Sequence, residues 1–514
     1  EGNRVITIAV LPFETRIGPE YIAEGITDDI ITRLTVIRQF RVTNKFRSRE
    51  FAGNLGPVED IARDLQVSLL LKGSVDSHNG QIAIRAQLLD QNNDFIWSNT
   101  YYRTPENILV LQSEIAQIIA EQLRIHLSET EKTRLTRKAT NNPAAYDLYL
   151  KGRSLYYKYD PELNDSAEIL FKQALKLDSN YAPAWAGLGD VFAQRFGRFN
   201  QEFFWTDSSL AAGNQAVQID SNLSEAYKTI ATAYDYRDDY ESGLQFLLKA
   251  VELDPNDDRA IGNLGTNYHL RGDLPTALMY QKRANSMNPK NWIPYQLIGW
   301  IYRLLGDLKN AEQWLRKSLE FKDGDIQPDT YEHLAYTLVA QGKNQEALEL
   351  IPTVLKIGGD SRVLEIAGLI AYFSGDEVHA KQYFQQSIDS NSFYKQDHYT
   401  VSPIGLGQIL LEEGNRIEAE VYLNHAFENN LHEANKGSKS TDPPYNLASI
   451  YAIRGNREKS LEWLKRAIEL KWVDYTRFYN GPYFYRYKND PEFVALMEQV
   501  KEKVRTMRST LSEN

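Results

Sequence analysis

The residue types that most often carry covalent or metal chemistry are sparse in this sequence. It contains no Cys, which removes disulfides, thiolate zinc sites, iron–sulfur clusters and Cys nucleophiles together. Its eight His are scattered without an H-E-x-x-H pattern. Neither G-x-x-x-x-G-K-[ST] nor G-x-G-x-x-G occurs, so the glycine loops that cradle phosphates are missing as well. We therefore expect no catalytic residue, no metal site and no cofactor in this chain.

Two clusters resemble metal-ligand sets only loosely. His425 and His432 lie seven residues apart with Glu428 between them, which fits a helix face and the turn after it better than a metal site. Asp323-Gly324-Asp325 followed by Asp329 lacks the Glu that a calcium loop carries at its last position. We predict a turn there, with metal binding as the alternative in both places.

Charge and hydropathy narrow the classes of partner. Lys and Arg number 58 against 69 Asp and Glu, a net charge of −11, so no specific nucleic-acid partner is expected. The basic stretch from Arg38 to Arg49 predicts a solvated edge, with a polyanion contact as the alternative. Thr27, Asp28 and Asp29 fall inside a predicted helix and are expected to form a solvated face. No apolar run approaches the ~18 residues that a membrane-spanning helix needs.

The first 130 residues alternate strand and helix signals. Strands are predicted at 5–11, 40–43, 68–75, 81–89 and 95–102, and helices at 20–37, 57–65 and 105–127. Asn79-Gly80 is a strong hairpin signal between the third and fourth strands. The order β-α-β-α-β-β-β-α predicts a compact α/β domain with one mixed sheet.

Several motifs of this segment occur together in one family in the same order. They are Ile8-Ala9-Val10-Leu11-Pro12-Phe13, Ala23-Glu24-Gly25-Ile26-Thr27-Asp28-Asp29-Ile30, and the stretches 61–65, 71–75, 85–90 and 96–98. Over residues 4–127 the segment resembles the TolB-N-like (FlgO-like) domain of bacterial signalling proteins. The resemblance implies an α/β fold without catalytic residues. Such domains occur beside class III nucleotide cyclases, winged-helix regulators and protein kinases, usually with helical repeats following.

From residue 145 the pattern changes to internal repeats. Small residues recur in pairs twelve positions apart, such as Gly265 with Ala277. Pro255 and Pro289, which end two successive repeats, lie 34 residues apart. Six repeats also carry a Gly where a tight turn between two helices is expected: Gly272, Gly306, Gly342, Gly375, Gly414 and Gly455.

This pattern resembles the tetratricopeptide repeat (TPR), whose period is about 34 residues. We count nine repeats, and their first small residues are Gly152, Gly189, Ala231, Gly265, Gly299, Ala335, Gly368, Gly407 and Ala448. The resemblance implies an all-α right-handed solenoid of about nine helix-turn-helix repeats with a concave surface. The second repeat carries an aromatic-rich insertion at 196–205.

In tetratricopeptide proteins the first helix of each repeat lines the groove, and a protein or peptide partner is therefore predicted there. By register, the residues expected in the groove are Lys228, Thr232, Tyr236, His269, Gln296, Trp300, Arg303, Glu332, Tyr336, Glu365 and Tyr372. Aromatic and Arg side chains are typical binding anchors, although several of these could simply pack the superhelix. The carboxylate-clamp subfamily wants Lys and Asn where Gly262, Thr266, Gln296 and Trp300 stand here, which disfavours a peptide C-terminus as the ligand.

Two aromatic groups lie outside the repeat pattern. The tail group predicts a C-terminal aromatic cap over the last repeat, with a binding platform as the alternative. The insertion group is expected either to lock the α/β domain onto the solenoid or to contact a partner. The residues concerned are Trp472, Tyr475, Tyr479 and Tyr483 in the tail, and Phe203, Phe204 and Trp205 in the insertion.

The expected organisation is an α/β domain at 1–130, a linker at 131–144, a TPR solenoid at 145–471 and a capping segment at 472–514. The sequence opens Glu1-Gly2-Asn3-Arg4 without an initiator Met or a leader, so we expect it to be a piece of a longer protein. The absence of Cys fits either an oxidising or a reducing compartment. An extracytoplasmic location is favoured over a cytoplasmic one.

The predicted function is a non-enzymatic interaction and sensory module, the regulatory part of a larger bacterial signal-transduction protein. Any cyclase or kinase domain would lie outside this chain. The alternative is a structural scaffold subunit of a larger envelope or multi-protein assembly. A homo-oligomer is compatible with both.

Overall fold

The computed structural model describes residues 5–53, 56–78, 81–104, 108–199, 201–321, 328–390 and 400–511. The chain divides into two compact units. The first comprises Glu1–Leu264 with Arg283–Lys290, and the second comprises Gly265–Lys282 with Asn291–Asn514. The predicted loop around Asp323 lies outside the described residues.

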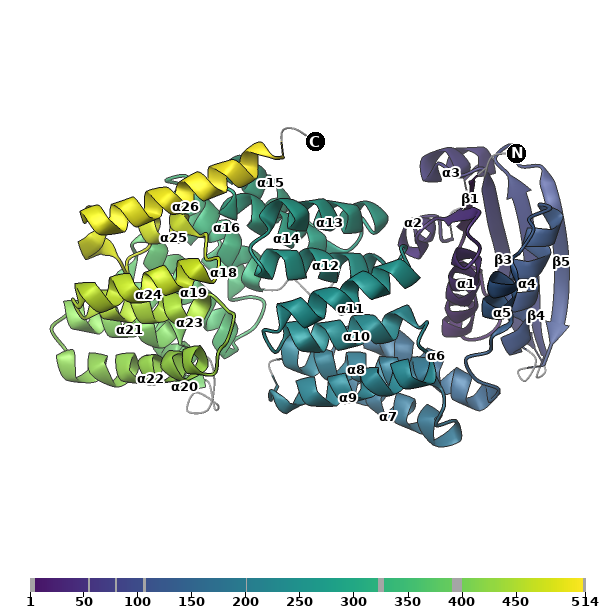
Figure 1. The fold of residues 1–514 in the computed structure, drawn as a ribbon, viewed down its shortest axis with the longest axis horizontal. Helices are drawn as coiled ribbons and strands as arrows, with labels where there is room; N and C mark the ends of the chain where they lie inside the picture. Colours follow the sequence, from purple (N-terminus) through teal and green to yellow (C-terminus); the bar gives the residue numbers. More distant parts are fainter. Residues whose placement is uncertain are drawn as a thin grey trace. The chain divides into compact units, whose positions relative to one another are not determined.

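A five-stranded mixed sheet forms the N-terminal part of the first unit (Figure 1). Its strands are β1 (Ile6–Val10), β2 (Phe40–Val42), β3 (Leu69–His78), β4 (Gln81–Asp90) and β5 (Phe95–Arg103), in the order β2-β1-β3-β4-β5. β1 pairs in parallel with β2 and β3, whereas β3, β4 and β5 are antiparallel. The predicted mixed sheet and the β3–β4 hairpin are therefore confirmed, although Asn79 and Gly80 themselves lie outside the described residues.

Helices cover both faces of this sheet because its strands alternate apolar side chains between the two faces. They are α1 (Glu20–Thr35), α2 (Lys45–Arg49), α3 (Val58–Leu65) and α4 (Ile108–Gln122). Ile8 and Val10 of β1 pack in one core with residues of α1 and α4, while Ala9 packs in a second core with residues of α3. α2 lies at the end of the basic stretch that runs from Arg38 to Arg49, where no helix was predicted. The helix expected to reach 127 ends at Gln122, and Arg124 just beyond it takes a left-handed φ of 54°.

The segment expected to be a linker, 131–144, contains most of α5 (Glu129–Thr136). Ser128 begins this helix with a capping box, in which its hydroxyl accepts from the amide of Glu131 while the Glu131 carboxylate accepts from the amide of Ser128. The segment therefore holds a defined helix between the sheet and the repeats.

Antiparallel helix pairs follow from residue 143. In the first unit they are α6 (Pro143–Tyr156) with α7 (Pro161–Leu177), α8 (Ala182–Gly197) with α9 (Phe204–Ile219), and α10 (Ser224–Asp235) with α11 (Tyr240–Leu253). α12 (Asp258–Leu270) and α13 (Leu274–Met287) contribute residues to both units. Asp and Asn side chains cap several of these helices; Asp160, for example, accepts from the amide of Leu163.

The second unit continues the same pattern. Its pairs are α14 (Trp292–Leu304) with α15 (Leu308–Leu319), α16 (Pro328–Ala340) with α17 (Asn344–Leu348) and α18 (Ile351–Val354), α19 (Ser361–Ser374) with α20 (Glu377–Ser390), α21 (Val401–Glu412) with α22 (Arg416–Asn435), and α23 (Asp442–Ile453) with α24 (Arg457–Glu469). The chain then forms α25 (Tyr475–Asn480), a short 3-10 helix η2 (Tyr485–Tyr487) and α26 (Pro491–Ser509).

The turns between the two helices of a pair contain Gly at the positions predicted from the sequence. All six predicted turn glycines have positive φ, between 70° and 90°, a region that favours Gly because it has no Cβ. One second helix departs from the pattern, since it is divided into α17 and α18. Pro352 stands in the first turn of α18 and has no amide hydrogen for the helical ladder, which explains the break.

Candidate functional site

Thr27, Asp28 and Asp29 do not form a solvated face, contrary to the sequence prediction. Thr27 and Asp28 are each 5% exposed, because α1 lies against α6 of the first repeat. The Thr27 hydroxyl accepts from the amide of Phe13 at 3.1 Å and donates to the carbonyl of Ala23 at 2.8 Å. Polarity alone suggested an exposed face, and only the docking of the repeats shows that it is internal.

Asp28 is the centre of an ion network between the α/β domain and the repeats. Its carboxylate accepts from Lys45 Nζ at 2.8 Å and from the guanidinium of Arg153 on α6, and Arg49 lies 3.8 Å away. Burial alone would raise the pKa of Asp28, but the charges of Lys45, Arg153 and Arg49 outweigh it and hold that pKa well below its usual range. Asp28 therefore stays ionised and ties α1 and α2 to the first repeat.

The neighbouring Asp29 and Arg33 extend this contact. The Tyr146 hydroxyl of α6 donates to Asp29, whose pKa is nevertheless raised by burial. Arg33 donates to the carbonyl oxygens of Leu135 and Arg137. Both lie in the connecting segment (residues 131–144) between the sheet and the repeats. One side of α1 thus holds both α6 and this connecting segment.

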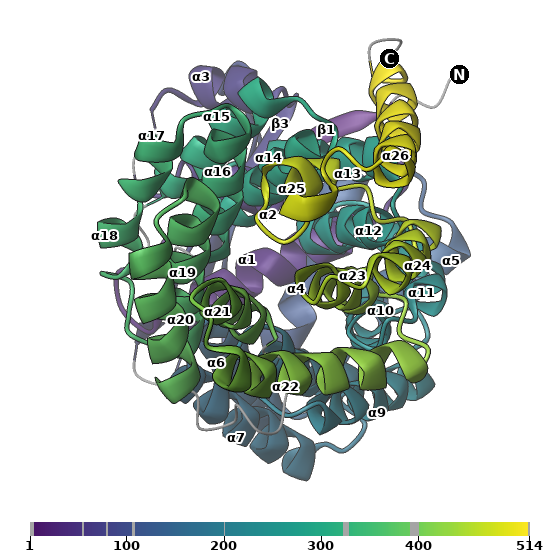
Figure 2. The ribbon, with the colours of Figure 1, turned by 90° about the vertical axis from the view of Figure 1, so that its left-hand side faces the viewer.

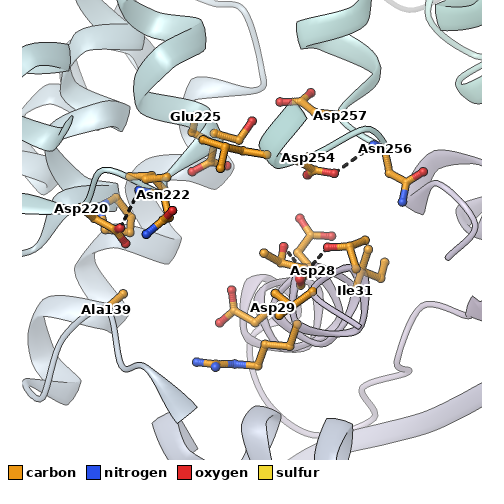
Figure 3. A pocket seen from close by; sticks show the side chains of 18 of the residues that line it. Asp28, Asp29, Ile31, Ala139, Asp220, Asn222, Glu225, Asp254, Asn256 and Asp257 are labelled. Carbon is orange, nitrogen blue, oxygen red and sulfur yellow. Dashed lines mark hydrogen bonds between the residues drawn. The ribbon is translucent and has the colours of Figure 1, made fainter. Parts of the chain in front are cut away.

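A pocket of about 290 Å³ opens beside this network, within the first unit. Its walls come from α1, from the connecting segment around Ala139, and from the loops that precede α8, α10 and α12 (Figure 3). At one edge the Asn44 side chain donates to the carbonyl of Asn256 at 2.8 Å, which links the α/β domain directly to the loop before α12. Both parts of the unit therefore contribute to a single cavity.

Carboxylates from the inter-repeat loops face this cavity opposite Asp28 and Asp29 (Figure 3). Asp220 pairs with Arg137 at 2.6 Å, and Asp257 begins α12 by accepting from the amides of residues 259 and 260. Asp254 accepts from the amide of residue 256 at 2.9 Å. Burial, together with the charge of Asp257, raises the pKa of Asp254 to about 6.

The groove residues predicted in the first unit have partners inside the protein. Lys228 is buried and pairs with Asp190 at 2.6 Å. The Thr232 hydroxyl donates to the carbonyl of residue 228 and accepts from Asn263 at 3.1 Å. The Tyr236 ring packs edge-on against Phe196, with 5.4 Å between ring centroids. Their role in binding a partner stays a prediction.

The groove residues predicted in the second unit include two members of an aromatic cluster. Trp300 lies between His269 and His333, with ring centroids 4.3 Å and 4.4 Å away. Burial, reinforced by the charge of Arg303, lowers the pKa of His269 to about 4 and that of His333 to about 3. Both imidazoles are therefore neutral near pH 7.

The remaining predicted groove residues of this unit are also engaged. Gln296 and Tyr372 are buried. Glu332 and Glu365 both accept from Arg362, at 2.7 Å and 2.5 Å. Seven of the eleven predicted groove residues are buried, so few of them present a free side chain. Ten of the eleven lie on the first helices of the repeats, and Tyr236 follows the end of α10. Sequence register could not show what covers them.

Residues 474–483, named the C-terminal segment, contact the first helices of five successive helix pairs in the second unit. Asp474 pairs with Arg303 of α14 at 2.8 Å, and Arg477 lies over Tyr336 of α16, 5.6 Å from its ring centroid. Further contacts join Tyr483 to Tyr372 and Phe373 of α19, Pro482 to Gln408 of α21, and Arg477 to Tyr445 of α23. Figure 2 shows α25 on the inner side of these helices. The chain's own segment therefore occupies the groove of this unit.

The aromatic groups outside the repeats divide by burial. Trp472 and Tyr483 are buried, and Trp472 stacks on Tyr445 of the last pair, as a cap would. Tyr475 and Tyr479 are half-buried. In the insertion, Trp205 stacks on Phe192 with 5.1 Å between centroids, whereas Phe203 and Phe204 are exposed. Their role as partner contacts stays a prediction.

The family model for the tetratricopeptide repeat matches residues 224–257, 294–324 and 445–471. The chain contains tetratricopeptide repeats. The matched segments correspond to the pairs α10–α11, α14–α15 and α23–α24, so the repeats occur in both units.

One curated relative carries a functional name. The chain is 29% identical over 241 residues to a protein named "Putative adenylate cyclase 3" from Rhizobium meliloti (strain 1021). The aligned stretch covers 45% of this chain and 40% of that protein. The chain thus spans less than half of the relative's length.

Solved structures are similar at low identity. The human IFIT1 dimer with m7Gppp-AAAA is 15% identical with a TM-score of 0.43, covering 70% of this chain and 77% of its own. Pseudomonas aeruginosa pilF is 18% identical with a TM-score of 0.35, covering 46% and 98%. YrrB, titled a TPR protein with an unusual peptide-binding site, is 20% identical with a TM-score of 0.28, covering 38% and 96%. Likenesses at these TM-scores carry no functional information.

Within the described residues, no helix is long and apolar enough to cross a membrane. The same part of the chain contains no group of three or more His, Asp or Glu side chains arranged to hold a metal ion.

Proposed function

We propose that this chain is a non-enzymatic interaction and sensory module, the regulatory part of a larger bacterial signal-transduction protein. Its α/β part is a TolB-N-like (FlgO-like) domain, and its repeats bind a protein, a peptide or a small ligand. The strand and helix order of the α/β part and the motifs along it support this resemblance. The cyclase-named relative fits a signalling context.

The pocket of the first unit carries this proposal. Its walls come from α1 of the α/β domain and from the loops of the repeats, so a ligand there would contact both. A ligand that binds one arrangement of two parts better than another shifts the population toward that arrangement. Occupancy of this pocket would therefore change how firmly the α/β domain is held on the repeats, which is the kind of change a sensor transmits.

A ligand panel can test the proposal on the whole chain. Thermal unfolding is followed with a panel of amino acids, amines, organic acids, nucleotides and short peptides, and a ligand of the pocket is expected to raise the unfolding temperature. Ala139→Trp would block the pocket because Ala139 is exposed on its wall. Ala211→Trp, at an exposed position on α9, is the matched control.

We expect Ala139→Trp to abolish the stabilisation by the ligand and Ala211→Trp to retain it. If no member of the panel stabilises the chain, or if both variants respond like the unmodified protein, the pocket is not the sensory site.

The absence of enzymatic activity has its own test, since the relative is named for a cyclase. Incubating the purified chain with ATP and either Mg²⁺ or Mn²⁺ should give no cyclic AMP above a no-protein blank. Measurable cyclic AMP from the chain, lost on heat denaturation, would show that it is an enzyme.

A further inference from the structure

The two edges of the five-stranded sheet are unequally protected against pairing with a further strand. β2 forms one edge; it has three residues, and the exposed Arg41 stands at its centre. β5 forms the other edge (Figure 1); it has nine residues, and only the last of them, Arg103, is charged. Proteins usually protect an edge strand by making it short or by placing charged residues or proline on it. Within the described residues no strand other than β4 pairs with β5, so this long edge is open.

The outer side of β5 carries main-chain groups that do not bond to β4. The amide of Thr100 donates instead to the side chain of Asn99 at 2.9 Å. The carbonyl of Tyr102 accepts from the side chain of Arg103 at 3.2 Å. Main-chain groups alternate between the two sides of a strand, so those of Ser98 also point away from β4, whereas those of Asn99 point toward it. Both side-chain contacts are exposed to solvent, and a pairing strand can replace them at little cost.

Large apolar side chains are gathered along this edge. Phe95 and Tyr102 are 62% and 66% exposed. Trp97 and Tyr101 pack with the core that β5 shares with α4, and their ring centroids lie 6.4 Å apart. Trp97 is only half-buried. A long strand edge with exposed aromatic residues and no internal charge is a surface suited to pairing with another chain.

We infer that β5 pairs antiparallel with β5 of a second copy of this chain, around a two-fold axis at Asn99. In this register Ser98 lies opposite Thr100 of the second copy, and Trp97 lies opposite Tyr101. Aromatic residues and hydroxyl residues that stand directly opposite one another stabilise antiparallel strands. The two sheets then join into one continuous sheet.

The strand's own sequence is the reason for assigning a second copy as the occupant. Residues 97–101 follow the order aromatic, hydroxyl, Asn, hydroxyl, aromatic, which is the same in both directions. Two antiparallel copies therefore offer each other matched side chains at every position. Arg103 comes opposite Phe95 and not opposite its own copy, so no like charges meet. The β-bulge at Leu88/Leu89 lies beyond Trp97 and leaves 97–101 regular.

Charge substitutions at the axis test the inference on the full chain. Light scattering after size-exclusion chromatography, over about 1–100 µM, should show the unmodified chain passing from one to two chains per particle. Asn99 is exposed, and Asn99→Lys or Asn99→Asp would set two like charges against each other, so each variant alone should stay monomeric. An equal mixture of the two should restore the dimer, because opposite charges then meet. Asn141→Lys, at an exposed position of the connecting segment, is the matched control and should dimerise like the unmodified chain.

A cross-link provides a second measurement that does not depend on the charged variants. The chain contains no Cys, so Asn99→Cys introduces a single thiol. Residues opposite each other in such a non-hydrogen-bonded pair have Cα atoms about 4.5 Å apart, within the range that a disulfide spans. Mild oxidation should therefore convert Asn99→Cys, but not Asn141→Cys, into a covalent dimer.

Several outcomes would overturn the inference. One is an unmodified chain that stays monomeric at every concentration. Another is a dimer that both charged Asn99 variants keep, since the chains would then associate through a different surface. A mixture of the two variants that stays monomeric, or equal cross-linking of Asn99→Cys and Asn141→Cys, contradicts the pairing at this axis.

Discussion

Asp28 and the two cations that hold it make the strongest residue-level claim. Asp28→Asn leaves Lys45 and Arg153 partly buried without their counter-charge, a change that costs about 3–5 kcal/mol in comparable sites. We expect the free energy of unfolding of the first unit to fall by about 3 kcal/mol, measured by urea denaturation near neutral pH. Asp60→Asn, which removes an exposed partner of Arg63, should change it by less than about 0.5 kcal/mol. Equal effects of the two substitutions would contradict the ion network.

Ionisation of Asp254 lowers the stability of the folded chain, whereas ionisation of Asp28 raises it. Its pKa is about 6 in the folded chain and near 3.9 when unfolded, so between these values the unfolded chain loses its proton first. The wild-type chain therefore loses stability through this group as pH rises from about 4 to above 6. Asp254→Asn, which cannot ionise, should be more stable than the wild type by about 1–2 kcal/mol at pH 7.5 and equal at pH 4.

Denaturation curves of both proteins at these two pH values provide the measurement. Glu252→Gln, whose carboxylate is exposed, should show no such pH-dependent difference. A wild type that is as stable as Asp254→Asn at pH 7.5 would show that the pKa of Asp254 is not raised in the folded chain.

Sequence reasoning predicted residues of a groove but assigned no site to the residues that line the pocket. In the sequence, Asp28 and Asp29 look like an exposed polar stretch. The partner of Asp28, Arg153, lies 125 positions away, so the local sequence does not show that this acid is paired. Asp254 and Asp257 look like ordinary turn and cap residues, and they are. One weak sequence signal existed: the two acids stand between Ile26 and Ile30, which belong to the apolar side of the predicted helix.

At the scale of elements, the small residues of the repeats give a matched pair of substitutions. A Cβ at Gly368 of α19 would lie 2.5 Å from the Phe384 ring, whereas one at Gly262 of α12 would lie 3.8 Å from Ala284. Gly368→Ala should therefore destabilise the chain by about 1–3 kcal/mol through overpacking. Gly262→Ala should be neutral or stabilising by up to about 1 kcal/mol, because Ala is the better helix former. Thermal unfolding of both variants checks this, and a reversed order would refute the packing described.

The elements themselves could largely be predicted, because they depend on local patterns. Five strands, the long helices and the glycine turns follow from apolar periodicity and from residues suited to positive φ. Two features were not predicted: the helix α2, which depends on ion pairs with a distant residue, and the break between α17 and α18, which depends on one proline. α2 is stabilised by Lys45 and Arg49 near Asp28, and Pro352 divides α17 from α18.

At the scale of the whole second unit, the chain's own C-terminal segment occupies the groove. Tyr483→Ala removes a buried ring that packs on Tyr372 and Phe373, so we expect a loss of about 3–4 kcal/mol in the free energy of unfolding of this unit. Tyr485→Ala, two residues on and 76% exposed, should change it by less than about 0.5 kcal/mol. Chemical denaturation distinguishes them, and similar values would mean that the segment is not packed in the groove.

In the second unit, the C-terminal segment of the chain fills the groove that the first helices of the repeats line. Hydrogen–deuterium exchange of the full chain, without any ligand, measures this directly. We predict that the amides of α25, Gly481 and Tyr483 exchange as slowly as those of α16 and α19, which this segment contacts. Exchange of this segment within seconds, while α16 and α19 stay protected, would contradict the claim and restore an open groove.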